Sequence, residues 1–232
     1  MVLDITGWKD LSGQRLYAWW DNPIGQNLNP LEWRDKVEIN WCSNEPNRMC
    51  YNPTAVDYFG LPVTMGPYNN DDCPNVEYTG QDSISVQDVE SLCPTEYIET
   101  GEAGVCKSPF QVCVGGSTDE LCSHLDSKIT ECVNDGSCQS GVTTTQAYGC
   151  SDWFGAQPDI CAALNRGIYP TDDQSDISKF YVNEPFSSYA KFVHTNNAKH
   201  YAFAYDDVGG QGTSGYNECE TNFLSVTFCP SQ

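Results

Sequence analysis

Carboxylates are the side chains in this sequence best placed for chemistry. The chain holds 32 aspartates and glutamates, and two of them, Glu38 and Asp57, stand in the strand-like segments DKVEINW and AVDYFGLPVTM. One protonated and one ionised carboxyl group can together donate a proton to a leaving oxygen and activate a water molecule. Glu38 and Asp57 are therefore candidates for such a pair, because both stand in strand-like sequence that could present them on a sheet.

Other reaction classes lack their usual residue patterns. The chain contains no Gly-x-Ser-x-Gly segment, no phosphate-binding loop and no metal-binding helix motif. The three histidines, His124, His194 and His200, have no nucleophile at a recognisable spacing. Acyl transfer and phosphoryl transfer are therefore disfavoured, and we expect no cofactor and no bound metal.

The cysteine content points to an oxidising compartment. Thirteen cysteines in 232 residues are too many for a reducing cytosol, and no Cys-x-x-Cys pair suggests a zinc site. The start, MVLDITGWKD, lacks a basic segment followed by an apolar one, and no apolar run approaches the 18 residues that a membrane span needs. We expect a secreted protein whose signal peptide has been removed.

The charge balance narrows the choice of partner. Eleven basic residues against 32 acidic ones give a formal net charge of −21. Such a charge repels phosphate backbones and anionic lipids, so neither nucleic acid nor a membrane is an expected partner. A neutral polymer remains compatible.

The elements that would position the two carboxylates are mainly strands. Alternating apolar residues and aromatics over 13–65 predict antiparallel strands. Nine cysteines between 71 and 161 predict a loop-rich subdomain with short helices near 86–92 and 120–133. Another short helix is expected after Pro185, with its aromatic rings packed in the core. The last two predicted strands are HYAFAYDD and NFLSVTFC.

Five ordered segments resemble two related groups of proteins, the thaumatin-like proteins and the β-1,3-glucanases of glycoside hydrolase family 64. They are Gly13–Trp19, Lys36–Asn40, Asn52–Pro62, Ala163–Gly167 with Tyr189–His194, and the end YAFAYDDV with SVTFCP. The resemblance implies a mainly β fold, a thaumatin-like antiparallel β-sandwich with a disulfide-rich loop and short-helix subdomain. Residues 1–70 and 176–232 would form the sandwich, and residues 71–175 the subdomain.

The resemblance also implies disulfide pairings. It pairs Cys73 with Cys219 and Cys93 with Cys106. Cys42 and Cys50 would close a short hairpin insert. Six further cysteines allow fifteen pairings, and sequence alone does not choose among them: Cys113, Cys122, Cys132, Cys138, Cys150 and Cys161.

Cys229 is left without a partner by this scheme. Members of the resembling families begin with further strands and a cysteine that pairs with the last one. We therefore expect a missing or separate N-terminal piece, or a separate chain, joined through Cys229.

The same resemblance assigns roles to the carboxylates. Glu38 would be the acid and Asp57 the base of an inverting enzyme, with their carboxyl groups roughly 6.5 to 9.5 Å apart. Arg15 would hold a sugar hydroxyl or tune a carboxylate. Asp206 and Asp207 would line an acidic cleft, although a structural role in a turn fits them as well. Four tryptophans could stack on sugar faces, although at least two of them fit the core better: Trp19, Trp20, Trp41 and Trp153.

Three functions compete on this evidence. The first is an endo-acting β-1,3-glucanase directed at β-1,3-glucan or a related polysaccharide. The second is a non-catalytic carbohydrate-binding or defence protein that uses the same cleft. The third is a structural component of an extracellular assembly, which the unpaired Cys229 favours.

Overall fold

Two antiparallel sheets form the lower part of the molecule. The computed structural model describes residues 2–4, 14–18, 35–41, 49–60, 63–67, 79–80, 86–98, 104–114, 120–170, 173–183, 187–195, 200–209, 215–216 and 223–228. The first sheet runs β1 (Val2–Asp4), β10 (Phe223–Phe228), β6 (Val63–Pro67) and β7 (Thr79–Gly80). The second runs β2 (Gln14–Ala18), β3 (Asp35–Trp41), β4 (Met49–Thr54) and β9 (Gly215–Tyr216). All pairings within them are antiparallel.

The sheets pack face to face through a small apolar core. Strand alternation sends every second side chain to the same face. The members of this core are Val37, Ile39 and Tyr51 from the second sheet and Val63, Met65, Leu224 and Val226 from the first. The antiparallel sandwich expected from the sequence is therefore present.

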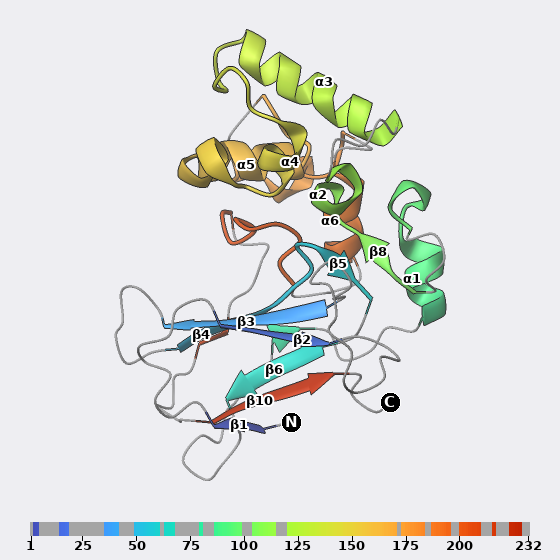
Figure 1. Ribbon diagram of the computed structural model, residues 1–232, viewed down its shortest axis with the longest axis vertical. Coiled ribbons are helices and arrows are strands. Elements are labelled where there is room, and N and C mark those ends of the chain that lie inside the picture. The colour runs from blue at the N-terminus through green and yellow to red at the C-terminus, as the bar shows by residue number, and fades with distance from the viewer. Residues whose placement is uncertain are drawn as a thin grey trace.

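A helical layer covers the other face of the second sheet (Figure 1). Its helices are α1 (Val86–Leu92), α2 (Pro109–Cys113), α3 (Glu120–Asn134), α4 (Thr144–Tyr148), α5 (Pro158–Asn165) and α6 (Ser188–Thr195). Three 3-10 helices, η3 (Thr95–Tyr97), η4 (Asp152–Ala156) and η5 (Ile177–Lys179), join them. A ribbon of β5 (Tyr58–Phe59) with β8 (Cys106–Lys107) connects this layer to β4.

The helical layer has its own core, which is larger than that of the sandwich. Helix α3 buries Leu121, Leu125 and Ile129 on one face, at the spacing of an amphipathic helix. Helix α2 begins at Pro109, and its N-cap Ser108 accepts a hydrogen bond from Gln111 N at 3.3 Å. None of the helices in the described residues is long and apolar enough to cross a membrane.

Among the described residues, four disulfides cross-link the helical layer, and each closes a short loop. The expected bridge between Cys93 and Cys106 is present. The six cysteines whose pairing was open bond to their sequence neighbours, as Cys113–Cys122, Cys132–Cys138 and Cys150–Cys161. On the chain-entropy model, loops of this size contribute about 2–3 kcal/mol each.

The remaining cysteine predictions fall mostly outside the described residues. Cys50 is disulfide-bonded, but its partner is not among the residues described. Cys42, Cys73, Cys219 and Cys229 also lie outside them, so the pairings proposed for these cysteines stay predictions.

Several predicted helices and one predicted strand are confirmed, whereas the predicted fold class is not. The helices expected near 86–92 and 120–133 and after Pro185 are confirmed as α1, α3 and α6, and NFLSVTFC contains β10. The expectation of a mainly β protein is not confirmed, because helices hold more of the described residues than strands do. The predicted division into two domains stays a prediction, although α6 packs in the core of the helical layer.

The strand predicted over HYAFAYDD is wrong. Only Tyr201 pairs with a strand residue, Thr54, and residues 202–209 form turns. The carboxylate of Asp206 accepts a hydrogen bond from Ala202 N at 2.8 Å, which folds the chain back on itself. A tertiary contact therefore overrides the alternating pattern.

A buried ion pair holds this turn in the helical layer. Arg166, at the end of α5, donates to Asp206 Oδ1 at 3.1 Å and to its backbone oxygen at 2.7 Å, and both side chains are fully buried. His194 Nε2 lies 2.7 Å from Asp206 Oδ2. The guanidinium also lies over the rings of Phe180 and Phe203, with its carbon 4.7 and 5.2 Å from their centroids.

Replacing Arg166 by methionine should lower the free energy of unfolding by about 3–5 kcal/mol, because Asp206 would stay buried without its counter-charge. Urea unfolding measures this cost. The control is Lys179→Met, which removes the exposed ion pair with Asp176 and should cost less than about 1 kcal/mol. Equal costs for the two variants would contradict a structural role for the buried pair.

Candidate functional site

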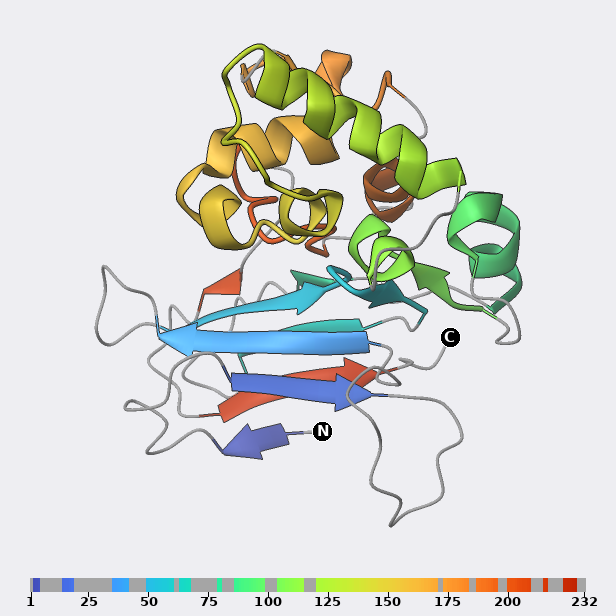
Figure 2. The same ribbon diagram turned by 45° about the horizontal axis from the view of Figure 1, so that its top comes forward.

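The candidate carboxylates lie where the second sheet meets the helical layer. Along β3, Val37 and Ile39 face the sandwich core, so Lys36 and Glu38 take the opposite face. Along β4, Tyr51 faces the core and Asn52 and Thr54 the opposite face. Figure 2 shows the helices on that side of the sheet. We call Lys36, Glu38, Asn52 and Thr54 the polar face.

Strand register places two polar residues beside Glu38. In the antiparallel pairing, Arg15 of β2 lies opposite Glu38, and Asn52 of β4 lies opposite it on the other side. Directly opposed residues in adjacent strands share a face of the sheet. Glu38 itself is half-buried. Glu38 and Asn52 therefore lie side by side on the polar face, and Arg15 is the register partner of Glu38 on β2.

Asp57 is held by groups from both layers. It follows β4 by three residues, and its carboxylate pairs with Nζ of Lys36. Gln111 of α2 donates Nε2 to Asp57 Oδ1 at 3.0 Å. The hydroxyl of Tyr58 lies 3.3 Å from Gln111 Oε1 and donates to it, which points the amide nitrogen at Asp57.

Burial makes the pair of Lys36 and Asp57 more than a surface contact. The Lys36 side chain is 8% exposed and that of Asp57 is 26% exposed. An ammonium group taken out of water is costly unless a carboxylate pairs with it. Lys36 therefore holds the Asp57 side chain in place while leaving part of that carboxylate open to solvent.

Backbone hydrogen bonds clamp the segment that carries Asp57. On one side, Ser108 N donates to Asp57 O at 2.9 Å, next to the ribbon of β5 and β8. On the other side, Ala55 N donates to Tyr201 O at 2.7 Å, and Tyr201 N donates to Pro53 O at 3.1 Å. Asp57 is thus positioned by the two layers together.

The two aspartates predicted to line an acidic cleft lie in different environments. Asp206 is fully buried and engaged by Arg166, His194 and Ala202, which favours its structural role. Asp207 is exposed. These observations do not support an acidic cleft built on both residues.

Sequence reasoning missed two residues that hold Asp57. Lys36 could have been found, because it stands two positions before Glu38 and strand alternation puts both on one face. Gln111 is 54 residues from Asp57, and no local pattern marks that contact. Among the described residues, no group of three His, Cys, Asp or Glu side chains could hold a metal ion.

A buried histidine lies close to the clamped segment. His200 is 2% exposed, and its ring meets that of Phe59 edge to face with centroids 5.3 Å apart. Neither ring nitrogen has a hydrogen-bond partner in the described part of the chain. Burial, with a smaller contribution from the charge of His194, lowers the pKa of His200 to about 3.

A family model supplies the first comparison with known proteins. A model described as glycoside hydrolase family 64, β-1,3-glucanase, matches residues 128–221. This match covers less than half of the chain and includes Arg166 and Asp206 but neither Glu38 nor Asp57. A search of curated proteins gives no match.

Solved structures extend the likeness to most of the chain. A β-1,3-glucanase domain from Clostridium beijerinckii superposes with a TM-score of 0.57 at 16% identity, covering 78% of this chain and 62% of that one. The laminaripentaose-producing β-1,3-glucanase from Paenibacillus barengoltzii superposes with a TM-score of 0.56 at 23% identity, covering 85% and 48%. This chain has the fold of family 64 β-1,3-glucanases.

The similarity in fold covers only part of these glucanases. The chain spans about half to two thirds of the length of these glucanases. The P. barengoltzii enzyme has also been crystallised in complex with laminarihexaose, and that complex superposes with a TM-score of 0.54. The thaumatin-like part of the sequence resemblance gains no support from the comparisons.

The low pKa of His200 predicts a loss of stability in mild acid. The unfolded chain binds a proton at His200 below a pKa of about 6.5, whereas the folded chain stays neutral there down to about 3. Stability should therefore fall as the pH drops below about 6.5, by about 1.4 kcal/mol per pH unit.

Urea unfolding of the wild type and of His200→Leu at pH 7 and pH 4.5 checks this prediction. Between these two pH values, the free energy of unfolding of His200→Leu should fall by about 2–3 kcal/mol less than that of the wild type. His124→Asn, at an exposed histidine, serves as the control and should follow the wild type. An unchanged pH dependence in His200→Leu would show that His200 is not the group responsible.

Proposed function

We propose that the protein is a secreted glycoside hydrolase that acts on β-1,3-glucan, with Glu38 as the acid and Asp57 as the base. The observation that carries the proposal is the polar face with the clamped Asp57, in a chain that has the fold of β-1,3-glucanases. The cysteine content and the disulfides support an extracellular location.

Lys36 supports the role of Asp57 as the base. Its ammonium group pairs with one oxygen of the Asp57 carboxylate and so holds the group that would accept a proton from water. Each carboxylate oxygen has two lone pairs, so the bonds to Lys36 and Gln111 leave room for a water molecule. Glu38 is then the carboxyl group left to donate a proton to the leaving oxygen.

An inverting mechanism is part of the proposal. Glu38 lies on β3, two residues along the strand from Lys36, and the Lys36 side chain pairs with Asp57. Inversion requires the carboxyl groups of Glu38 and Asp57 to lie roughly 6.5–9.5 Å apart, so that a water molecule fits between Asp57 and the sugar.

A neutral polysaccharide suits the charge of the chain. The net charge of −21 disfavours anionic polymers. The P. barengoltzii relative has been crystallised with laminarihexaose, which supports a β-1,3-glucan as the substrate class here. The sequence-based expectation of endo action stays a prediction.

Glu38→Gln and Asp57→Asn should each lower the release of reducing sugar from laminarin by about 100-fold or more, because each variant removes one partner of the proton transfer. The matched controls are Glu90→Gln on α1 and Asp159→Asn on α5, which make the same chemical changes at exposed positions and should keep full activity.

Folding must be separated from chemistry in Asp57→Asn, because this variant leaves the buried Lys36 without a counter-charge. The double variant Lys36→Met with Asp57→Asn removes both charges, so it should regain stability in thermal unfolding while staying inactive. Folded Glu38→Gln or Asp57→Asn protein with wild-type activity would overturn the assigned roles. Wild-type protein that binds laminarin without cleaving it would instead support the non-catalytic alternative.

A further inference from the structure

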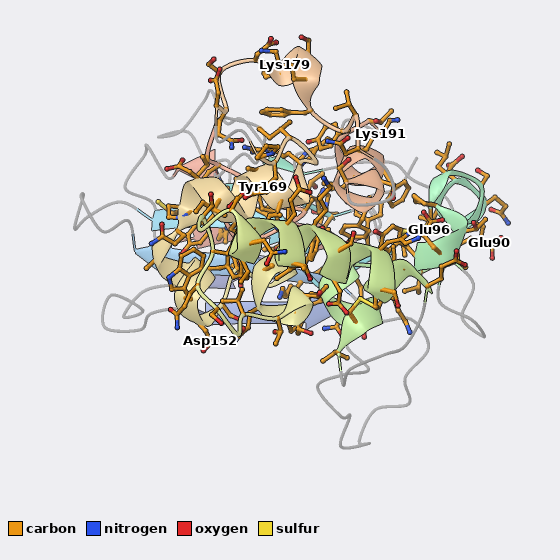
Figure 3. All side chains as sticks on the ribbon, turned by 90° about the horizontal axis from the view of Figure 1, so that it is seen from above. Glu90, Glu96, Asp152, Tyr169, Lys179 and Lys191 are labelled. Carbon is orange, nitrogen blue, oxygen red and sulfur yellow. A yellow bond between two sulfur atoms is a disulfide. The ribbon has the colours of Figure 1, made fainter. Side chains whose placement is uncertain are left out.

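An open pocket lies on the helical layer, away from the residues assigned above. Its volume is about 250 Å³. One wall is the loop after α3, including Gln139 and Ser140, and the other is formed by Gln146, Asp152 and Trp153 from α4 and η4. We call this the Trp153 pocket. In Figure 3, Asp152 lies at one end of the helical layer and Glu90 and Glu96 at the other.

Disulfides fix both walls of the Trp153 pocket. The loop wall begins directly after Cys138, which is bonded to Cys132 of α3. In the opposite wall, Asp152 and Trp153 lie between Cys150 and Cys161, which are bonded to each other. The Tyr205 hydroxyl also donates to Gly155 O in η4 at 2.5 Å. A pocket held in this way is formed before any ligand arrives.

Hydrogen bonds orient the polar side chains of the pocket. Gln146 Oε1 accepts from Thr143 N at 2.9 Å, and Gln146 Nε2 donates to Asp152 Oδ2 at 3.0 Å. Ser151 also donates to Oδ2. No described residue donates to the other oxygen, Oδ1 of the exposed Asp152. Asp152 thus lines the pocket with one carboxylate oxygen bonded to its neighbours and with no donor to the other among the described residues.

Trp153 adds a rigid aromatic surface. Its ring is half-buried and packs edge to face against Phe154, with centroids 5.0 Å apart and planes at 80°. Phe154 is fully buried, so the Trp153 indole packs on a ring that the core holds in place. Asp152 itself has a φ of +51°, a conformation that residues other than glycine rarely adopt and that is often found at functional sites.

We propose that the Trp153 pocket binds one sugar ring of a neutral glucan, as a second carbohydrate site. An aromatic ring suits the C–H face of a sugar, and a fixed carboxylate oxygen suits its hydroxyl donors. The net charge of −21 and Asp152 disfavour an anionic ligand. The volume is below the range of about 300–1,000 Å³ typical of drug-sized ligands, and fits a single ring. That the sugar belongs to a glucan rests on the proposed function.

The test is ¹⁹F NMR of the Glu38→Gln protein labelled with 5-fluorotryptophan. The chain has six tryptophans, and the signal that disappears in Trp153→Phe belongs to Trp153. Laminarihexaose, cellohexaose and maltohexaose are titrated separately to about 10 mM, enough to fill a site with a Kd of about 1 mM. We expect a saturable shift of the Trp153 signal with at least one of them.

Asp152→Gly removes the carboxylate while glycine tolerates the positive φ, so the fold should be kept. It should weaken the sugar-dependent shift of Trp153 about tenfold or more, as expected for a lost bond to a charged acceptor. Asp173→Gly, at an exposed aspartate that lies outside the helices and outside the Trp153 pocket, is the control and should leave the shift unchanged.

The outcomes separate this proposal from the proposed function. If laminarihexaose binds by calorimetry but none of the three sugars moves the Trp153 signal, the pocket proposal is overturned and the glucanase proposal stands. If the Trp153 signal shifts while wild-type protein neither cleaves nor otherwise binds laminarin, the pocket stands and the glucanase proposal fails. A shift that Asp152→Gly leaves at full strength would also overturn the pocket proposal.

Discussion

The ion pair of Lys36 and Asp57 is the interaction on which the candidate site depends. A lysine that is 8% exposed needs a negative partner, and Asp57 is the partner that the fold provides. Removing one member would leave a buried charge, whereas keeping both fixes a carboxylate at the boundary of two layers. The site therefore exists only when the sandwich and the helical layer are joined, because Lys36 comes from the first and Gln111 from the second.

The rest of the helical layer can be understood as the support of that contact. Arg166 holds Asp206, and Asp206 holds Ala202 N, which fixes the chain next to Tyr201. Tyr201 in turn is hydrogen-bonded to Pro53 and Ala55, on the segment that leads to Asp57. Through these contacts the buried ion pair of Arg166 and Asp206 helps to position Asp57, although the ion pair lies far from Asp57 in the sequence. The described disulfides lie in this same layer and limit its freedom when unfolded.

The sequence predicted those elements whose structure follows from the periodicity of neighbouring residues, and it missed contacts between residues far apart in the chain. Helix α3 and strand β3 were predictable because their apolar residues repeat at helical and strand periods. The strand alternation that marked Glu38 also contained the information for Lys36. The contact from Gln111 to Asp57 had no such signal, since it depends on how α2 packs. The pattern in HYAFAYDD misled because Asp206 bonds within its own turn, and a two-residue alternation does not encode that contact.

Stereochemistry gives the most direct test of the central claim that Glu38 and Asp57 act as the acid and base of an inverting glucanase. Proton NMR of laminarin treated with the wild-type protein reports the anomer that forms first, before mutarotation. The account predicts the α-anomer, because water activated by Asp57 attacks the face opposite to the leaving oxygen. The β-anomer as the first product would contradict it, since Asp57 or another carboxylate would then act as a nucleophile with retention.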